Sequence, residues 1–233
     1  AYATNLSDYP GATTEKDLIA NAYFIYSSEI LLKIAKLLGK NEDVSKYYSV
    51  NKKVKEAFIK EFVTPNGRLV SHTQTAYSLA LAFKILPDEL AKKAVSYLEK
   101  DVKKFGHITC GFVGTPLLCK SLSENNLDYL AFMLLNRKEY PSWLYPVTQG
   151  ATTIWERWDG QKPDGTFQDP GMNSFNHYAY GAIGEWLYQY VSGLNIDEDK
   201  PGYKHIIFAP HIGGNLSYSK VEYNSMYGLI LSS

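Results

Sequence analysis

The chain has 233 residues, of which 45% are hydrophobic and 21% are charged, a composition typical of a globular protein with a sizeable core. Its 24 Lys and Arg residues balance 24 Asp and Glu residues, which argues against nucleic acid or an anionic membrane as the main partner, because both attract basic surfaces. No apolar run approaches the roughly 20 residues that cross a bilayer. No signal peptide is recognisable and the first residue is Ala1, so we expect missing upstream residues and leave a cytoplasmic or periplasmic location open.

The N-terminal part of the sequence predicts a pair of helices. Residues 1–15 read as a loop, and Thr14 with Asp17 resembles a capping box for the first helix. Apolar residues then recur at helical spacing as far as Gly39, and a second stripe ends before the turn at 64–67. The two stripes are Leu18, Ala22, Ile25, Leu32 and Ala35, and Val44, Tyr47, Val54, Phe58 and Phe62. Two helices joined by a short connection form a helical hairpin.

The same pattern continues to residue 193. Helices are predicted over 73–86 and 88–105, the second with Leu90, Ala94, Leu98 and Val102 on its buried face. Short helices follow in "PLLCKSLSE" and "LDYLAFMLLN". A long loop leads to a helix through "ATTIWERW", and a second loop leads to a long helix over 173–193. These segments predict about eight helices in roughly four hairpins.

The last segment of the chain has a different character. From residue 201, Pro, Gly, Asn and Ser separate short segments of alternating polarity, "HIIFA", "LSYSKVEY" and "MYGLIL", which read as β-strands. We therefore expect a helical domain over 1–200 and the start of a C-terminal β-domain over 201–233. One or two hairpins cannot bury a face unaided, so these strands should lean on other parts of the protein.

Cysteine and histidine usage gives no sign of a metal or cofactor site. Cys110 and Cys119 show no metal spacing with any histidine, and we expect two buried free thiols, with a disulfide as the alternative. Histidines 72, 107, 205 and 211 are scattered. The sequence contains no Gly-rich phosphate loop and no G-x-S-x-G elbow. Aromatic residues make up 14% of the chain, including 19 Tyr; they suit sugar rings, although many of them could simply line helix interfaces.

One acid stands among aromatic residues in the stretch "GATTIWERWDG" at 150–160. Glu156 lies between Trp155 and Trp158, with Arg157 beside it. Neighbouring indoles remove hydration from a carboxylate, while an adjacent guanidinium favours its charged form. A base that activates water must be ionised near neutral pH yet poorly hydrated, so the pattern predicts a general base. The alternative is structural: Glu156 caps a helix or forms an ion pair with Arg157 or another basic residue.

His177 is the second candidate, 21 residues further on in "NSFNHYAYGA". A neutral imidazole beside a carboxylate can donate a hydrogen bond to a sugar hydroxyl. The alternative is a core histidine satisfied by a backbone carbonyl. Three long loops, 1–13, 139–150 and 159–172, carry aromatic and polar groups. Loops beyond about 12 residues are often functional, and these favour helices that close around a site.

Five segments carry a resemblance to a known family: "TQTAYSLAL", "GFVGTPLL", "YPSWLYPVTQGATTIWERWDG", "MNSFNHYAYGAIGEWLYQ" and "PGYKHIIFAPHIGG". Together, in order and over nearly the whole chain, they resemble the bacterial α-L-rhamnosidases, an inverting glycoside hydrolase family. The resemblance implies a mainly α fold, an (α/α)6 toroid of helical hairpins followed by a C-terminal β-sandwich. About four of the six hairpins would fall within this chain, which would be the C-terminal portion of the protein.

The resemblance also implies roles for individual residues. Glu156 falls on the general base of the family's "TTIWERWD" motif, and His177 falls on the histidine that contacts the terminal rhamnose. The chain has Ser7-Asp8-Tyr9 where the family often has Gly-Asp-Trp, so Asp8 and Tyr9 would reach the sugar pocket, with Tyr9 replacing a tryptophan. Further expected pocket walls are Trp143, Tyr145 and Trp155. No metal ligand or cofactor is implied.

The resemblance places the family's general acid in an upstream stretch that has no counterpart in this sequence. An inverting glycosidase needs two carboxyl groups, so the 233 residues alone are predicted to be nearly inactive, within a protein that releases terminal α-L-rhamnose. The other hypotheses are a non-catalytic helical module that binds carbohydrate or protein, or another (α/α)6 glycosidase or lyase. Apolar faces left exposed on an open toroid would also favour self-association.

Overall fold

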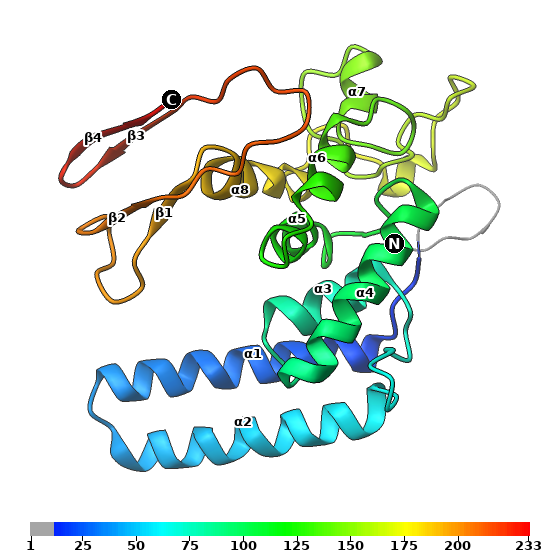
Figure 1. Cartoon of the computed structure of the whole chain (residues 1–233). Helices are drawn as coiled ribbons and strands as arrows, with labels where there is room; N and C mark the ends of the chain where they lie inside the picture. The colour runs from blue at the N-terminus through cyan, green and yellow to red at the C-terminus, as the bar shows by residue number, and fades with distance from the viewer. Residues whose placement is uncertain (1–11) are drawn as a thin grey trace. The chain divides into compact units, whose positions relative to one another are not determined.

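The computed structural model describes residues 12–233, so Asp8 and Tyr9 lie outside the described residues. The chain is mainly helical and ends in two small antiparallel sheets (Figure 1), as the sequence predicts. It divides into two compact units. The first contains the described residues up to Phe105 together with Thr109–Ser121, and the second contains Gly106–Ile108 together with Leu122–Ser233.

The first unit begins with a helical hairpin of α1 (Lys16–Leu37) and α2 (Asn41–Phe62). All five residues of the first predicted stripe are buried on α1. On α2, Phe58 and Phe62 are buried, whereas Val44, Tyr47 and Val54 are half-buried. A polar contact also lies in this interface: the buried Asn51 amide donates to the Ile25 carbonyl at 3.0 Å and to the Ser28 hydroxyl at 2.9 Å.

The capping box predicted at the start of the first helix was wrong. The residue that precedes α1 is Glu15, and no side chain caps the helix. The Thr14 hydroxyl is instead hydrogen-bonded to the Thr73 hydroxyl at 2.7 Å. Thr73 caps α3 (Gln74–Ala82) by accepting from the Ala76 amide. Thr14 therefore ties two helix starts together instead of capping its own helix.

The rest of the first unit consists of α3, α4 (Asp88–Phe105) and the start of α5 (Thr115–Ser123), which continues into the second unit. On α4, Ala94, Leu98 and Val102 are buried as predicted, whereas Leu90 is only half-buried. Helix α3 ends four residues earlier than the predicted residue 86. Cys110 and Cys119 are free and buried, which confirms the expected thiols. Burial raises the pKa of Cys110 to about 12 and raises that of Cys119 further.

The second unit contains shorter helices. They are α6 (Asp128–Asn136), α7 (Leu144–Thr148), η1 (Pro170–Met172), η2 (Ala179–Ala182), α8 (Ile183–Trp186) and the π-helical η3 (Leu187–Val191). Two predictions fail here, because residues 151–158 form no helix and the helix predicted from residue 173 begins at Ala179. Backbone N–H and C=O groups of the two segments form hydrogen bonds with each other, so they do not form helical hydrogen bonds.

The C-terminal strands form two hairpins, β1 (Leu194–Ile196) with β2 (Ile206–Phe208), and β3 (Val221–Ser225) with β4 (Gly228–Ser232). Strand structure therefore begins at Leu194, before the predicted residue 201. Gly193 makes this start possible: its φ is +72°, and a Cβ there would lie 2.2 Å from the Pro210 nitrogen. The two hairpins share a small core of Leu194, Val221 and Ile230, so they lean on each other.

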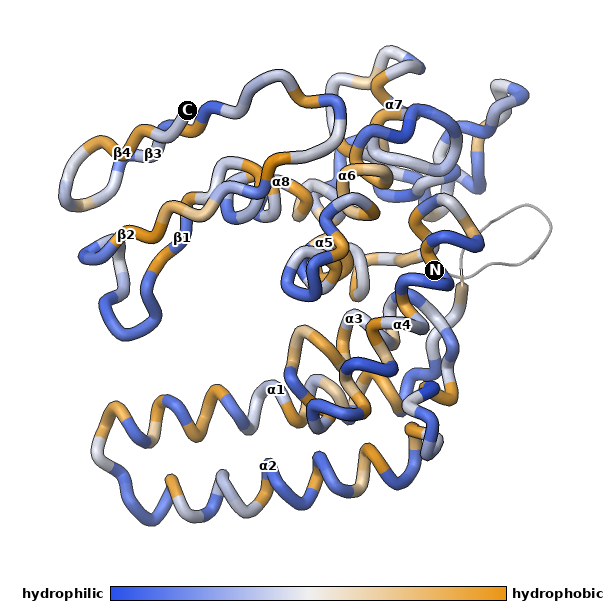
Figure 2. The backbone as a smooth tube through the Cα atoms, viewed as in Figure 1, coloured by the Kyte–Doolittle hydropathy of each residue, from blue (hydrophilic) through white to orange (hydrophobic). Residues whose placement is uncertain are grey.

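Helix α1 also carries apolar side chains away from its buried face. Phe24 and Leu37 are 51% and 87% exposed, and Figure 2 shows apolar residues recurring along the helix. Among the described residues, α1 is the one helix whose length and apolar composition would fit a membrane span. A core helix of a globular protein meets the same criterion, and α1 packs against α2 and α3, so this feature assigns no membrane role.

Candidate active site

The candidate site is built on two irregular segments of the second unit that run side by side in opposite directions. The Glu156 amide donates to the Ser174 carbonyl at 2.8 Å, and the His177 amide donates to the Ile154 carbonyl at 2.8 Å. The Thr153 hydroxyl also donates to the Phe175 carbonyl. These contacts satisfy backbone groups that have no helical partners. They bring Glu156 and His177, 21 residues apart in sequence, onto one short ladder.

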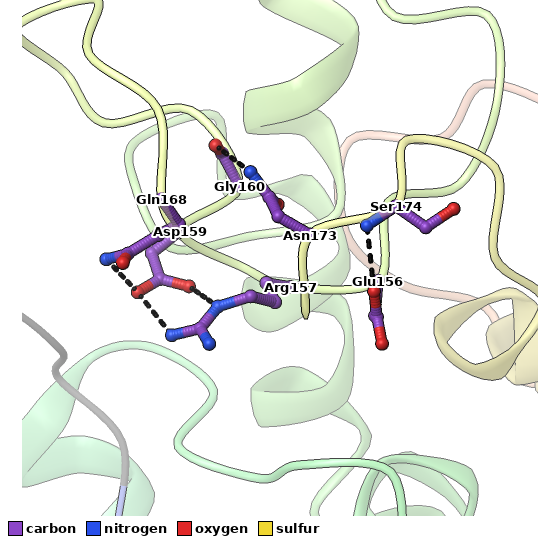
Figure 3. Close-up of polar contacts among 7 residues, drawn as sticks. All are labelled: Glu156, Arg157, Asp159, Gly160, Gln168, Asn173 and Ser174. Carbon is purple, nitrogen blue, oxygen red and sulfur yellow. Dashed lines mark hydrogen bonds and ion pairs between the residues drawn. The ribbon is translucent and has the colours of Figure 1, made fainter. Parts of the chain in front are cut away.

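The Glu156 carboxylate is held by a backbone amide. Its Oε2 accepts a hydrogen bond from the Ser174 amide at 2.7 Å (Figure 3), a short, charge-assisted contact. The side chain is half-buried, and within residues 12–233 its Oε1 accepts no hydrogen bond. One oxygen is therefore fixed, while the other keeps its capacity to accept a proton or a hydrogen bond from a ligand.

Arg157 uses its guanidinium on a different acid. Its Nε and a terminal nitrogen donate to the two oxygens of Asp159 at 2.8 and 3.1 Å. Asp159 is fully buried and also accepts a hydrogen bond from the side-chain amide of Gln168 at 2.7 Å. In Figure 3 this cluster and the Glu156 carboxylate point in different directions. Neither structural alternative for Glu156 holds in the described chain, since it caps no helix and its carboxylate is bonded to an amide.

The two indoles that flank Glu156 in sequence belong to a buried aromatic cluster. Trp158 is 3% exposed and stacks on Tyr180 with ring centroids 3.8 Å apart. Trp155 is 6% exposed and meets Phe175 edge to face at 5.0 Å. Rings in such arrangements bury large areas and resist reorientation. The packed rings therefore hold the backbone of residues 155–158, which has no regular secondary structure, in place around Glu156.

Trp143 and Tyr145, expected as pocket walls, lie in the same cluster. Trp143 meets Trp158 edge to face at 5.4 Å, and its indole donates to the Tyr180 carbonyl. Tyr145 meets Trp155 edge to face at 6.5 Å. Burial raises the pKa of Tyr145, and its buried hydroxyl has no hydrogen-bond partner among the described residues. Contact of these rings with a sugar stays a prediction, because here they pack mainly on one another.

A small cavity opens in this cluster. It has a volume of about 40 Å3 and is lined by Trp143, Pro146, Val147, Thr153, Ile154, Trp155, Arg157, Trp158 and Tyr180. Ligand pockets usually have volumes of several hundred Å3, so this cavity is too small to hold a sugar ring. It is a packing gap among the rings of the aromatic cluster.

The ring of His177 has a defined hydrogen bond at one nitrogen. The Ala179 amide donates to Nδ1 at 3.2 Å, so a neutral ring carries its proton on Nε2, where it is a donor. The ring also stacks on Tyr178 at 5.1 Å. This tautomer is the one that could donate to a sugar hydroxyl.

Sequence reasoning missed the groups that hold the site together. Ser174 contributes its backbone amide, which no residue type signals in a sequence. The sequence contained only a weak signal for the other two residues. Asp159 is a charged residue at the end of an aromatic motif, and Gln168 is an amide residue in the loop that follows. No cluster of three potential metal-ligating His, Cys, Asp or Glu side chains occurs within residues 12–233.

Comparison with known families decides the classification. Residues 2–191 match the model of the bacterial α-L-rhamnosidase six-hairpin glycosidase domain, and residues 193–233 match that of the bacterial α-L-rhamnosidase C-terminal domain. The chain belongs to the bacterial α-L-rhamnosidase family. The family resemblance and the partial six-hairpin fold expected from the sequence are thus confirmed. The domain boundary expected at residue 200 stays a prediction. The division into two compact units falls elsewhere in the chain and does not test it.

Relatives of this rhamnosidase-family chain are similar over nearly its whole length. An α-L-rhamnosidase of Streptomyces avermitilis is 39% identical over 96% of the chain, and one of Formosa agariphila is 41% identical over 100% of it. The chain spans only 21% and 26% of these two proteins.

Solved structures agree with this assignment. The crystal structure of the Streptomyces avermitilis α-L-rhamnosidase complexed with L-rhamnose matches 99% of the chain and 22% of that protein, at 37% identity and a TM-score of 0.90. The α-L-rhamnosidase of Aspergillus terreus matches 94% of the chain and 26% of that protein, at 36% identity and a TM-score of 0.91. The fold of this family member is therefore that of the corresponding part of these α-L-rhamnosidases.

Proposed function

We propose that this chain is the C-terminal part of an inverting α-L-rhamnosidase that releases terminal α-L-rhamnose from glycosides. The observation that carries the proposal is the half-buried Glu156, held through one oxygen by the Ser174 amide, in a chain of the α-L-rhamnosidase family. The complex of the Streptomyces avermitilis relative with L-rhamnose supports the choice of sugar. Nucleic acid and membrane are not among the proposed partners.

Glu156 acts as the general base in this proposal. Its carboxylate takes a proton from a water molecule whose oxygen attacks the anomeric carbon. The bond from that carbon to the leaving oxygen breaks, and a carboxylic acid protonates the leaving oxygen. The configuration at the anomeric carbon is inverted. With Oε2 fixed by Ser174, Oε1 is the atom assigned to the water proton.

The remaining groups bind the sugar. His177 donates to a rhamnose hydroxyl from Nε2, consistent with the hydrogen bond that Nδ1 accepts from Ala179. Asp8, Tyr9, Trp143, Tyr145 and Trp155 are proposed to shape the pocket. We assign the general acid, the second carboxyl that inversion requires, to a part of the full-length protein outside residues 1–233. No cofactor takes part in the proposed reaction.

Replacing the base tests the proposal directly. In the full-length protein that carries this chain, Glu156→Gln keeps the size of the side chain but removes the base. Turnover of an aryl α-L-rhamnoside should fall by about 10²- to 10⁴-fold, the usual contribution of a general base. Proton NMR of the first product formed by the unmodified protein should show the β-anomer of rhamnose.

Glu185 provides a matched control. It is an exposed glutamate on α8 in the same unit, hydrogen-bonded to Gln189. Glu185→Gln should leave turnover near normal. Near-normal turnover of Glu156→Gln would remove Glu156 from the mechanism, and an unsaturated sugar product would indicate a lyase instead.

We also infer that the exposed apolar side chains of α1 associate with further protein. Phe24, Leu31 and Leu37 are 51%, 42% and 87% exposed, and large exposed apolar patches usually mark interfaces. Sedimentation velocity of the 233-residue chain should show self-association that weakens on Leu31→Lys. A monodisperse monomer at micromolar concentration would contradict this inference.

A further inference from the structure

The cluster of buried Asp159 with Arg157 and Gln168 has no role in the reaction as proposed above. Asp159 has no exposed surface, and its two oxygens accept three hydrogen bonds of 2.7–3.1 Å. Burying a carboxylate is costly unless it is paired and fully hydrogen-bonded. The buried Asp159 carboxylate lies three residues after the proposed base, which points to a role of this side chain beyond packing.

The cluster fixes both ends of the loop that follows Asp159. Arg157 and Asp159 stand before the loop, and Gln168 stands near its end. At the same point the Gln168 backbone N–H donates to the Gly160 carbonyl at 3.2 Å. Between these ends the chain turns back on itself, with Gln161 paired to Phe167 in an isolated bridge.

The same anchor reaches Ser174. The Asn173 side chain donates to the Gly160 carbonyl at 2.9 Å. The approach is close, since a Cβ added at Gly160 would lie 2.9 Å from the Asn173 side-chain oxygen and 3.4 Å from the Phe175 ring. Asn173 and Phe175 thus pack against Gly160, the residue that follows Asp159 in the chain. The next amide, that of Ser174, is the donor to the Glu156 carboxylate.

We propose that Asp159 is a positioning residue for the proposed base. It anchors the loop that carries the Ser174 amide, so that this amide fixes one oxygen of Glu156 and leaves the other directed to the water. This inference rests on the proposed function, because positioning matters only if Glu156 is the base. Figure 3 shows the whole chain of contacts, from Gln168 and Asp159 through Gly160 and Asn173 to Ser174 and Glu156.

The first test is Asp159→Asn in the full-length protein. The new amide keeps the volume but places an N–H₂ group against donors, so the loop loses its anchor. Misplacing a catalytic group by about 1 Å costs on the order of 10²-fold in rate. We expect kcat to fall about 10- to 100-fold, with KM for the aryl rhamnoside changed by less than about threefold.

Asp164 is the matched control in the same loop. Its carboxylate also accepts hydrogen bonds, from the amide and the hydroxyl of Thr166, but it is exposed and lies outside the anchor. Asp164→Asn should keep kcat within about twofold of the unmodified protein, a change typical of exposed sites. An equal fall in both variants would show general sensitivity of the loop and overturn the positioning role.

A double-mutant cycle separates positioning from general damage. If Asp159 acts through Glu156, adding Asp159→Asn to Glu156→Gln should lower the residual kcat by less than about threefold, since coupled residues are non-additive. A full further loss in that background would overturn the inference. Normal kcat for Asp159→Asn with an impaired Glu156→Gln would overturn the inference alone. Normal kcat for Glu156→Gln would overturn the proposed function as well.

A second variant covers the case in which Asp159→Asn does not fold. Gln168→Met leaves the Arg157–Asp159 ion pair intact and removes only the donor at the end of the loop. Circular dichroism should show a folded protein, and kcat should fall about 3- to 10-fold with little change in KM, the pattern of an interaction that matters in the transition state. Unchanged kcat for a folded Gln168→Met protein would overturn the anchoring role.

Discussion

The α1–α2 hairpin and the loop pair around Glu156 are ordered in different ways. In the hairpin, two 22-residue helices bury apolar stripes, and the buried Asn51 side chain forms hydrogen bonds across the interface. Around Glu156, residues 151–178 contain little regular structure and are held by stacked rings and by hydrogen bonds between the segments. A helix satisfies its own backbone, whereas an irregular segment depends on particular distant partners. Substitutions in the hairpin should therefore lower stability alone, whereas substitutions around Glu156 should also lower kcat.

The largest expected effect comes from a matched pair of buried aromatics. Trp158 in the loop pair and Phe58 on α2 are 3% and 1% exposed. Truncation of either to Ala should lower the unfolding free energy by about 3–5 kcal/mol, the usual cost for a buried aromatic residue. Urea denaturation of the full-length protein would measure the loss.

The pair also tests the comparison through activity. Trp158→Ala removes the ring that stacks on Tyr180, so it should lower kcat even in the folded population. Phe58→Ala should leave kcat per folded molecule near normal. Equal loss of kcat in both variants would mean that the loop pair is no more specialised than the hairpin.

A smaller effect is expected at the polar contact of the hairpin. Asn51→Ala removes the donor to the Ile25 carbonyl and the Ser28 hydroxyl. A buried acceptor left without its partner costs about 1–3 kcal/mol. Asn51→Ala combined with Ser28→Ala should cost less than the sum of the two single changes, because the residues interact. Additive losses in thermal denaturation would show that this contact contributes little.

The smallest effect concerns the two thiols of the first unit. Burial raises the pKa of Cys110 to about 12, so almost none of it is thiolate at pH 8, and the thiolate is the reactive form. A chromogenic disulfide reagent should detect neither Cys110 nor Cys119 in the native protein and both after unfolding. Rapid modification of the native protein would contradict the burial of Cys110 and Cys119.

The same shift sets the sign of a pH effect on stability. The unfolded thiol ionises near pH 8.5, whereas the folded thiol stays protonated to a higher pH. The stability contributed by the buried thiols is thus fully present below about pH 8.5 and is lost as the pH rises from there towards the folded pKa. Cys110→Ala should flatten this decline in denaturation midpoints between pH 8 and pH 10. An unchanged slope would argue against the shift.

Sequence periodicity worked where helices pack through stripes. The buried residues of α1 and α4 were predicted because a 3.6-residue repeat leaves few alternatives for which face is inside. It failed at 151–158 and 173–178. There, apolar and aromatic residues are buried by ring stacking and not by helix formation, and the backbone amides bond across the two segments.

The family, the succession of helices and strands, and the choice of Glu156 and His177 as candidates followed from the sequence, since motifs and repeats are local properties of a chain. Only the tertiary structure decided that Glu156 bonds the Ser174 amide, that Arg157 pairs with buried Asp159, and that Trp155 and Trp158 turn into an aromatic cluster. The physical reason is that most of these contacts join residues far apart in the chain, and that the contact to Glu156 uses a backbone amide, which the residue type does not signal.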